Sequence, residues 1–169
     1  MTVHHPVTSK LMSCSLFREF GPSDLDRLLE LAAPRLFPAG MEIVLKGDDG
    51  GAMYIVAAGE AQAVVHSPDA LERGAARFKA GDFFGEMALL SRERHRVDVV
   101  AVTDCTVLTI TSVLIRMLGH SSPSAGFRLA MGILELARQR LRSVDHRAIG
   151  TGSAVCDHAD GAGMMERVA

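Results

Sequence analysis

Short β-prone runs separated by single glycines fill the middle of the chain, from Phe37 to Ile110. The glycines of this region are Gly40, Gly47, Gly50, Gly51, Gly59, Gly74, Gly81 and Gly85. Glycines at such intervals allow tight turns between strands of only a few residues. Because successive short strands joined by tight turns pair antiparallel, the region is predicted to form an antiparallel barrel or sandwich.

Two segments of this region show the alternation of apolar residues that is typical of half-buried strands. MYIVAAGEAQAVV predicts two strands with a turn at Gly59 and Glu60, and it places Met53, Ile55 and Ala57 on one face. VDVVAVTDCTVLTI predicts two more strands that meet near its central TD pair. Its alternating apolar positions are Val97, Val99, Ala101, Leu108 and Ile110.

Helical spacing of apolar residues returns on both sides of the β region. Before it, GPSDLDRLLELAAP predicts a helix that begins near Pro22 and Ser23, is favoured by Asp26 in its first turn, and ends at Pro34. A shorter helix is expected upstream, in the apolar run around residues 11–17. After the β region, TSVLIRMLG predicts a helix capped by Thr111 or Ser112, followed by a longer helix at 124–144.

The longer C-terminal helix carries an apolar stripe that needs a packing partner. The stripe consists of Phe127, Met131, Leu134, Ala137 and Leu141, which follow steps of three and four residues. The predicted fold class is therefore α+β and mainly β: an antiparallel β-roll or jelly-roll barrel with N-terminal helices and a C-terminal helix pair.

The bulk of the sequence indicates one domain. A chain of 169 residues is long enough for one core. We expect a flexible leader at 1–10, the domain at 11–146, and a flexible Gly-rich tail at 147–169. A net charge of −2, with scattered basic residues, argues against a nucleic-acid partner. Three cysteines at wide spacings fit reduced thiols and a cytoplasmic location. The sequence contains no run of about 20 apolar residues, so no membrane span is predicted.

One connection in the β region, at 80–101, contains a single predicted turn of helix. The turn covers residues 86–90 and is entered through Gly85, which lets the backbone approach a ligand closely. The free amides of such a turn suit an anion such as a phosphate. Glu86 at the same mouth suits a sugar hydroxyl, and Arg94, His95 and Arg96 can supply positive charge from the end of the loop. Together these groups indicate a site for a ribose phosphate.

The segment FGEMALLSRERHRVDVVA closely resembles the phosphate-binding cassette of cyclic nucleotide-binding domains, and FPAGMEIVLKGDDGGAMYIVAAGEAQA resembles the strands that precede it. The resemblance covers roughly residues 14–142, and bacterial sensor domains of cyclic nucleotide-regulated channels are among the similar proteins. It implies a regulatory module that binds a cyclic nucleotide, cAMP by family preference or else cGMP. It also implies that the trailing pair are the family's B and C helices, the last of them acting as a lid.

The resemblance assigns the ligand contacts residue by residue. Glu86 would bind the ribose 2′-hydroxyl, the amides near Ala88 would bind the phosphate, and Val97 and Val99 would border the base. The full set of candidate ligand-binding residues is Phe84, Gly85, Glu86, Met87, Ala88, Leu89, Arg94, His95, Arg96 and Val97. No catalytic residue and no metal are expected.

The sequence departs from the family at its phosphate-binding arginine. Without a gap, His95 stands at that position; with a loop one residue longer, Arg96 does. The gapless register preserves the downstream match better. Because a histidine is charged only below a pKa of about 6.5, this register predicts weaker binding, with an affinity that rises as the pH falls.

Three other functions are alternatives to a cyclic nucleotide sensor. A degenerate domain that serves as a protein interaction scaffold is the main alternative, and His95 is its motivation. A metal-dependent enzyme with a cupin-like barrel lacks clustered ligands, because the only histidines of the β region are His66 and His95. A DNA-binding activator would need a helix-turn-helix where only the Gly-rich tail follows. The partner that responds to ligand binding is expected to be an effector protein or an attached domain. A homo-oligomer of the chain is also compatible with the sequence.

Overall fold

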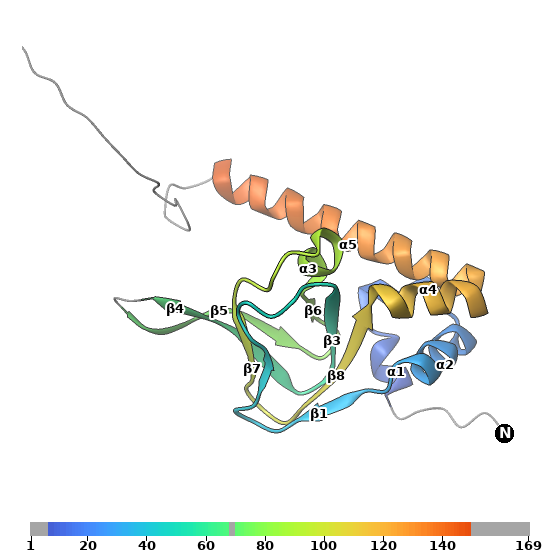
Figure 1. Ribbon diagram of the computed structural model, residues 1–169, viewed down its shortest axis with the longest axis horizontal. Coiled ribbons are helices and arrows are strands. Elements are labelled where there is room, and N and C mark those ends of the chain that lie inside the picture. The colour runs from blue at the N-terminus through green and yellow to red at the C-terminus, as the bar shows by residue number, and fades with distance from the viewer. Residues whose placement is uncertain (1–6, 68–69, 150–169) are drawn as a thin grey trace, which may run out of the picture.

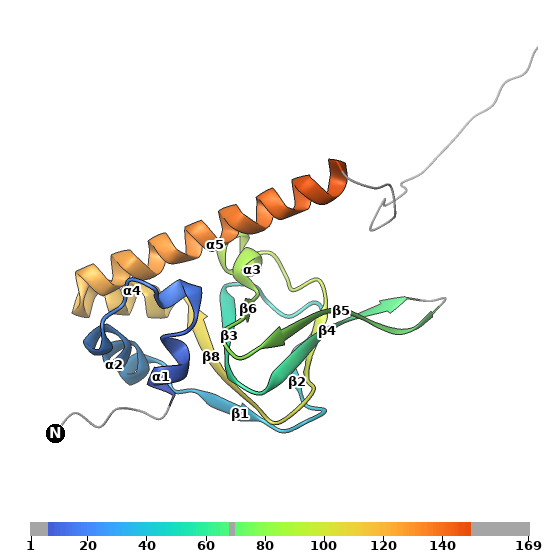
Figure 2. The same ribbon diagram turned by 180° about the vertical axis from the view of Figure 1, so that it is seen from behind.

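The computed structural model describes residues 7–67 and 70–149, and it shows two antiparallel four-stranded sheets with helices gathered on one side (Figures 1 and 2). The strands are β1 (Arg35–Phe37), β2 (Glu42–Val44), β3 (Ala52–Ala58), β4 (Glu60–Ser67), β5 (Ala70–Lys79), β6 (Phe83–Phe84), β7 (Asp98–Ala101) and β8 (Cys105–Thr111). The helices are α1 (Thr8–Leu11), the 3₁₀ helix η1 (Ser15–Phe17), α2 (Pro22–Leu31), α3 (Glu86–Ser91), α4 (Ser112–Ser121) and α5 (Pro123–Ile149). This arrangement confirms the predicted α+β class, as a β-roll of two sheets rather than a closed barrel.

The chain crosses between the two sheets at its main turns. One sheet has the strand order β1-β8-β3-β6 and the other β2-β7-β4-β5. The strands predicted around Gly59 are present as β3 and β4, but they belong to different sheets, so the turn is a crossing and not a hairpin. The same holds for β7 and β8. Strand positions were therefore predictable from alternation, whereas strand partners were not.

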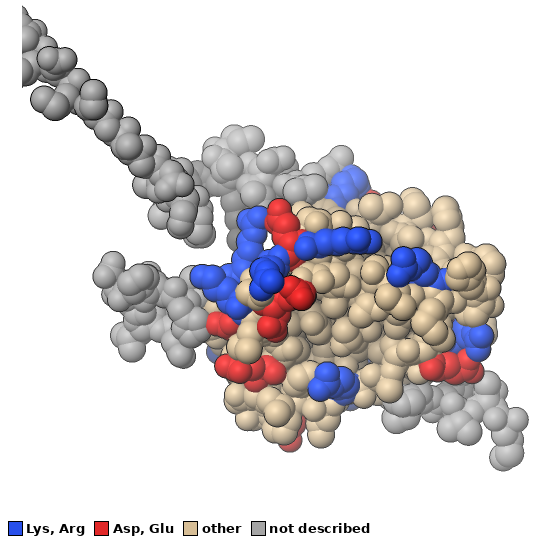
Figure 3. All heavy atoms as spheres, in the orientation of Figure 1, with Lys and Arg blue, Asp and Glu red and all other residues tan. Residues whose placement is uncertain are grey.

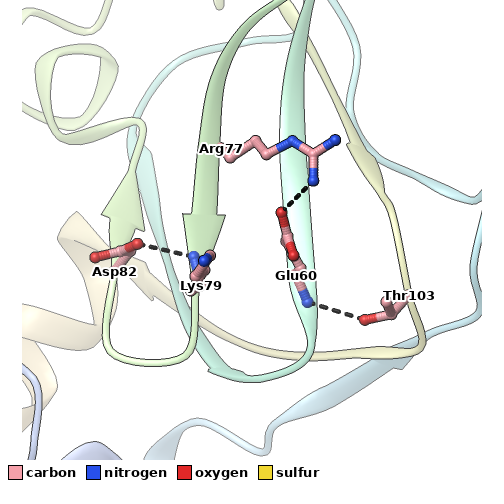
Figure 4. Close-up of polar contacts among 5 residues, drawn as sticks. All are labelled: Glu60, Arg77, Lys79, Asp82 and Thr103. Atoms are coloured by element: carbon pink, nitrogen blue, oxygen red, sulfur yellow. Dashed lines mark hydrogen bonds and ion pairs between the residues drawn. The ribbon is translucent and has the colours of Figure 1, made fainter.

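Side-chain hydrogen bonds hold this corner of the roll (Figure 4). The backbone N–H of Glu60 donates to Thr103 Oγ1 at 3.0 Å, which ties the start of β4 to the β7–β8 turn. Arg77 on β5 donates to the Glu60 carboxylate at 2.8 Å, and the N–H of Lys79 donates to Asp82 at 2.8 Å. The contacts of Glu60 with Thr103 and Arg77 join segments distant in sequence, and the contact of Lys79 with Asp82 closes the local turn after β5.

Replacing Gly59 by alanine is expected to destabilise the fold. Gly59 has a φ of 82°, and a Cβ there would lie 2.2 Å from the carbonyl oxygen of Asp104. Left-handed strain and overpacking together should lower the free energy of unfolding by about 2–4 kcal/mol. Gly40→Ala is the matched control, because Gly40 has the same φ of 82° with no atom within 4 Å. It should cost only about 1 kcal/mol. Urea unfolding followed by circular dichroism measures the stability of both variants. Equal losses of stability would contradict the close approach of Gly59 to Asp104 at the crossing.

Two apolar clusters flank the sheet that contains β3. The cluster inside the roll includes Val56, Phe84, Val99, Ala101 and Val107. The cluster between β3, β8 and the helices includes Met53, Ile55, Ala57, Leu108 and Ile110. Alternate residues of β3 therefore point to opposite sides, which confirms the face predicted for Met53, Ile55 and Ala57.

The N-terminal helices differ in detail from the prediction. Helix α2 begins two residues earlier than a Ser23 cap would allow, with Gly21 as its N-cap. Asp24, not Asp26, supports the first turn, because its carboxylate accepts the N–H of Gly21 at 3.0 Å. The single short helix expected upstream is divided into α1 and η1, and α1 begins at Thr8, inside the expected leader. Residues 1–6 and 150–169 of the expected leader and tail lie outside the described residues.

The C-terminal pair is present as α4 and α5, and α5 runs along α4 and passes over α3 (Figures 1 and 2). Thr111 caps α4 as predicted, since its hydroxyl accepts the N–H of Leu114 at 3.1 Å. No helix in the described part of the chain combines the length and the apolar character needed to cross a bilayer.

The face of α5 that packs on the core is not the predicted stripe. Among the α5 residues whose side chains the structure describes, the buried apolar ones are Ala125, Leu129, Ile133, Leu136 and Ala137. Phe127 is 67% exposed, and Met131 and Leu134 are also largely exposed, so of the stripe only Ala137 is buried, and the side chain of Leu141 lies outside the described residues. Apolar residues follow helical steps on two faces of α5, and the sequence pattern alone could not show which face meets the core.

Candidate ligand-binding site

A pocket of about 540 Å³ lies between α3, the loop that follows it, and the strands β4, β5 and β7. Its lining residues are Ala63, Phe78, Phe84, Gly85, Glu86, Met87, Ala88, Ser91, Glu93, Arg94, His95, Arg96, Val97 and Val99. The volume lies in the range of small-molecule sites. The structure thus brings every candidate ligand-binding residue except Leu89 to one pocket.

Gly85 shapes the mouth of this pocket, because its backbone is left-handed and closely surrounded. Its φ is 81°, and a Cβ there would lie 3.1 Å from the carbonyl oxygen of Ala52 and 3.2 Å from Cε1 of His95. The first hydrogen bond within α3 runs from the N–H of Leu89 to the carbonyl of Gly85 at 3.0 Å. The amides before Leu89 therefore precede the helical ladder, as the cassette prediction requires.

Glu86 is the most buried polar residue of the pocket. It begins α3 with only 1% of its surface exposed. A carboxylate at such a depth has given up most of its hydration, and hydrogen-bond donors must take the place of water. The position fits the predicted role of accepting a hydroxyl hydrogen from a bound sugar.

Leu89 belongs to the core and not to the pocket. It is buried in the cluster formed by β3, β8 and the helices. Met87 and Ala88, which precede it, do line the pocket, because one turn of helix presents its residues to different sides. We therefore assign Leu89 to anchoring α3, a distinction that the cassette sequence does not make.

His95 turns into the fold from the loop after α3. It is 9% exposed, and Nε2 is buried without a hydrogen-bond partner in the part of the chain that the structure describes. Its ring lies 5.9 Å from that of Tyr54, which stacks on Phe84. Its backbone is fixed by bonds to Gly47 and Asp48 at 2.8 and 3.0 Å. Burial lowers the pKa of His95 from its ordinary value, and the nearby charge of Asp48 opposes this only in part.

The two arginines beside His95 turn outward. Arg94 has a side chain 72% exposed, donates to the carbonyl of Gly47 at 2.7 Å and pairs with Asp49 at 3.2 Å. Arg96 is 83% exposed and pairs with Glu93 at 2.9 Å. On the face drawn in Figure 3, basic and acidic side chains are interleaved. The side chain that occupies the interior is therefore His95, in agreement with the gapless register.

The pocket also has an apolar lining, and part of it was not predicted. Val97 and Val99 were expected to border a base and do line the pocket. Ala63 and Phe78 join them from β4 and β5, which pair through Ala61 and Phe78. Their place depends on the register of a pairing between distant segments, for which the sequence offers only the alternation of apolar residues.

The pocket is lined by both polar and apolar groups. Within the described residues, no group of three His, Cys, Asp or Glu side chains could hold a metal ion. The lining combines the backbone of α3, a buried carboxylate and an imidazole with apolar side chains from β4, β5 and β7. Such a pocket suits a ligand with an anionic, hydroxyl-bearing end and a flat apolar end.

Three known proteins resemble the chain closely. A cyclic nucleotide-gated potassium channel of Rhizobium etli is 34% identical over 121 residues, covering 71% of this chain and 32% of the channel. The crystal structure of the Thermus thermophilus catabolite activator protein superimposes with a TM-score of 0.69 at 30% identity, covering 80% of this chain and 62% of that one. The regulatory domain of Toxoplasma gondii PKA, crystallised with cAMP, superimposes with a TM-score of 0.58 at 25% identity, covering 76% of this chain and 49% of that one.

The chain spans less than two thirds of each of these proteins. A sequence profile of the cyclic nucleotide-binding domain matches residues 34–120, which contain the whole pocket and all strands of both sheets. The fold, the pocket and this match agree, and the chain belongs to the cyclic nucleotide-binding domain family.

Proposed function

We propose that this chain is a cytoplasmic, non-enzymatic sensor that binds a cyclic nucleotide, with cAMP as its preferred ligand. The observation that carries the proposal is the pocket itself, in which Gly85, Glu86 and His95 come together at the position of the family's cassette. The likeness to the Toxoplasma gondii PKA regulatory domain, which was crystallised with cAMP, supports the choice of nucleotide.

The pocket offers a contact for each part of such a ligand. The phosphate would lie against the amides of Met87 and Ala88 and the imidazole of His95. The ribose hydroxyl would donate to Glu86. The base would rest on the apolar wall that includes Val97 and Phe78. Each contact uses the chemistry that the residue already presents, and no metal is needed.

Ligand binding would be transmitted through α3 to α5, because these helices are in contact. The N-terminal half of α5 is anchored by Leu129 and Ile133 in the core and by an ion pair between Arg128 and Asp24 on α2 at 2.7 Å. A cassette that closes on the nucleotide would therefore shift the C-terminal half of α5. An effector protein, an attached domain or a second copy of the chain would read this shift. The module itself would extend over residues 11–146.

A scaffold without nucleotide binding is the second candidate. Two observations favour it: His95 stands in place of the family's arginine, and Phe127, Met131 and Leu134 expose an apolar face on α5. In this case the pocket would be a remnant and the exposed face would carry the function.

Titration calorimetry separates the two candidates. The purified chain should bind cAMP and cGMP at pH 6, cAMP more tightly, and should not bind 5′-AMP, whose open phosphate carries a second charge and lacks the cyclised shape. Binding by a His95→Arg variant alone would favour the scaffold. Absence of binding by both proteins would contradict the sensor function.

A further inference from the structure

The pocket separates its permanent positive charges from its interior. Among its lining residues, the permanent cations are Arg94 and Arg96, and both guanidinium groups are engaged at the surface by Asp49 and Glu93. The interior end presents His95. An anion that enters the pocket therefore meets an ionisable side chain in the interior, where a permanent positive charge would attract it most strongly.

His95 is poised to gain a charge there. Its Nε2 is buried and lacks a hydrogen-bond partner among the described residues. Cε1 of the same ring lies beside Gly85, at the N-terminus of α3. A neutral imidazole carries hydrogen on one nitrogen only, whereas the imidazolium carries it on both. Protonation therefore guarantees that Nε2 is a donor, whichever tautomer is present before.

The charged and titratable groups around His95 come from several elements. Asp48 in the β2–β3 loop acts on its charge, and Tyr54 on β3 contacts its ring. Glu86 on α3 and Glu93, Arg94 and Arg96 in its own loop line the same pocket, and Asp98 is buried at the start of β7. Arg94 and Arg96 are paired with acids, and Tyr54 is a neutral phenol whose pKa burial raises further. Burial outweighs the attraction of Asp48 and lowers the pKa of His95, so the ring is neutral in the empty pocket at pH 7.

We infer that His95 takes up one proton from solvent when the phosphate binds, so that the pocket responds jointly to cyclic nucleotide and to acidity. The inference rests on the proposed function. The phosphate brings a negative charge to the ring and raises the pKa of His95 in the complex. The proton adds to the free ring nitrogen, and no bond of the ligand is broken.

The direction of the effect follows from linkage. Above the pKa of His95 in the complex, the affinity is low and constant. Between that value and the lower pKa of the empty pocket, the affinity rises by up to about tenfold for each unit that the pH falls. The pKa of His95 in the empty pocket lies under the ordinary value of about 6.5, and below that pKa the affinity is constant again.

Calorimetry of the whole chain with cAMP between pH 5.5 and 8 tests the inference, with two buffers of different ionisation enthalpy at each pH. We expect the affinity to rise toward low pH, with an uptake approaching one proton per ligand at its steepest point. His95→Arg and His95→Gln should both abolish the uptake. The matched control is His120→Gln, on the exposed side of α4, which should keep it.

The outcomes distinguish the inference from the function on which it rests. Binding by the wild type without proton uptake, or uptake that persists in His95→Gln, would overturn the inference and leave the sensor function standing. Absence of cAMP binding by the wild type and by His95→Arg over the whole pH range would overturn both.

Discussion

Replacing His95 by arginine is expected to raise the affinity for cAMP at pH 8 by roughly tenfold to a hundredfold. At this pH the imidazole is neutral, because burial lowers its pKa. A guanidinium keeps its charge and can donate to two phosphate oxygens at once. Since a hydrogen bond to a charged group contributes about 1.5–3 kcal/mol, the gain corresponds to one such contact. Titration calorimetry of both proteins at pH 8 measures it.

The control for this gain is Arg96→Ala. The Arg96 head is exposed and paired with Glu93, so its removal should change the affinity less than about threefold, in line with the small contribution of exposed ion pairs. If Arg96→Ala abolished binding and His95→Arg did not strengthen it, the phosphate ligand would be Arg96 and the longer loop register would be right.

The second large effect is expected for Glu86→Gln, which should weaken cAMP binding by roughly tenfold to a hundredfold. The variant keeps the size of the side chain but removes the negative charge that strengthens a hydrogen bond from the ribose hydroxyl. Because Glu86 is buried, the stability of the free variant is compared with that of the free wild type, so that a change in the fold is told apart from the loss of a ligand contact. Calorimetry and thermal unfolding measure the two quantities separately.

A double-mutant cycle with 2′-deoxy-cAMP identifies the contact. The wild type should prefer cAMP to its 2′-deoxy analogue by about the factor that Glu86→Gln loses, and the variant should discriminate little between them. Glu93→Gln, at an exposed acid of the same pocket, is the control and should retain full discrimination. Equal discrimination by wild type and Glu86→Gln would show that Glu86 does not bind the hydroxyl.

The features that the sequence predicted well are those set by local chemistry. The helical turn after Gly85 is present as α3, because a glycine that tolerates a φ of 81° precedes a short run of helix-forming residues. Thr111 caps α4 because its hydroxyl reaches an amide three residues on. The cassette residues then meet at one pocket because they are neighbours in the chain.

The features that the sequence did not predict depend on contacts between distant segments. The crossing at Gly59 requires the close approach of Asp104, which no local pattern indicates. The outward course of Arg94 depends on the carbonyl of Gly47 and on Asp49 in another loop. The sequence could not show which face of α5 meets the core, because Phe127 and Leu129 satisfy similar spacings, and only the packing on α4 and η1 buries Leu129.

A nuclear magnetic resonance titration of the ¹⁵N-labelled chain with cAMP at pH 6 tests most directly whether this pocket binds a cyclic nucleotide. We expect the largest shifts on the backbone amides from Gly85 to Ala88 and on the imidazole of His95, with smaller shifts in α5. A spectrum left unchanged by millimolar cAMP, or shifts that avoid α3 and His95, would contradict this expectation.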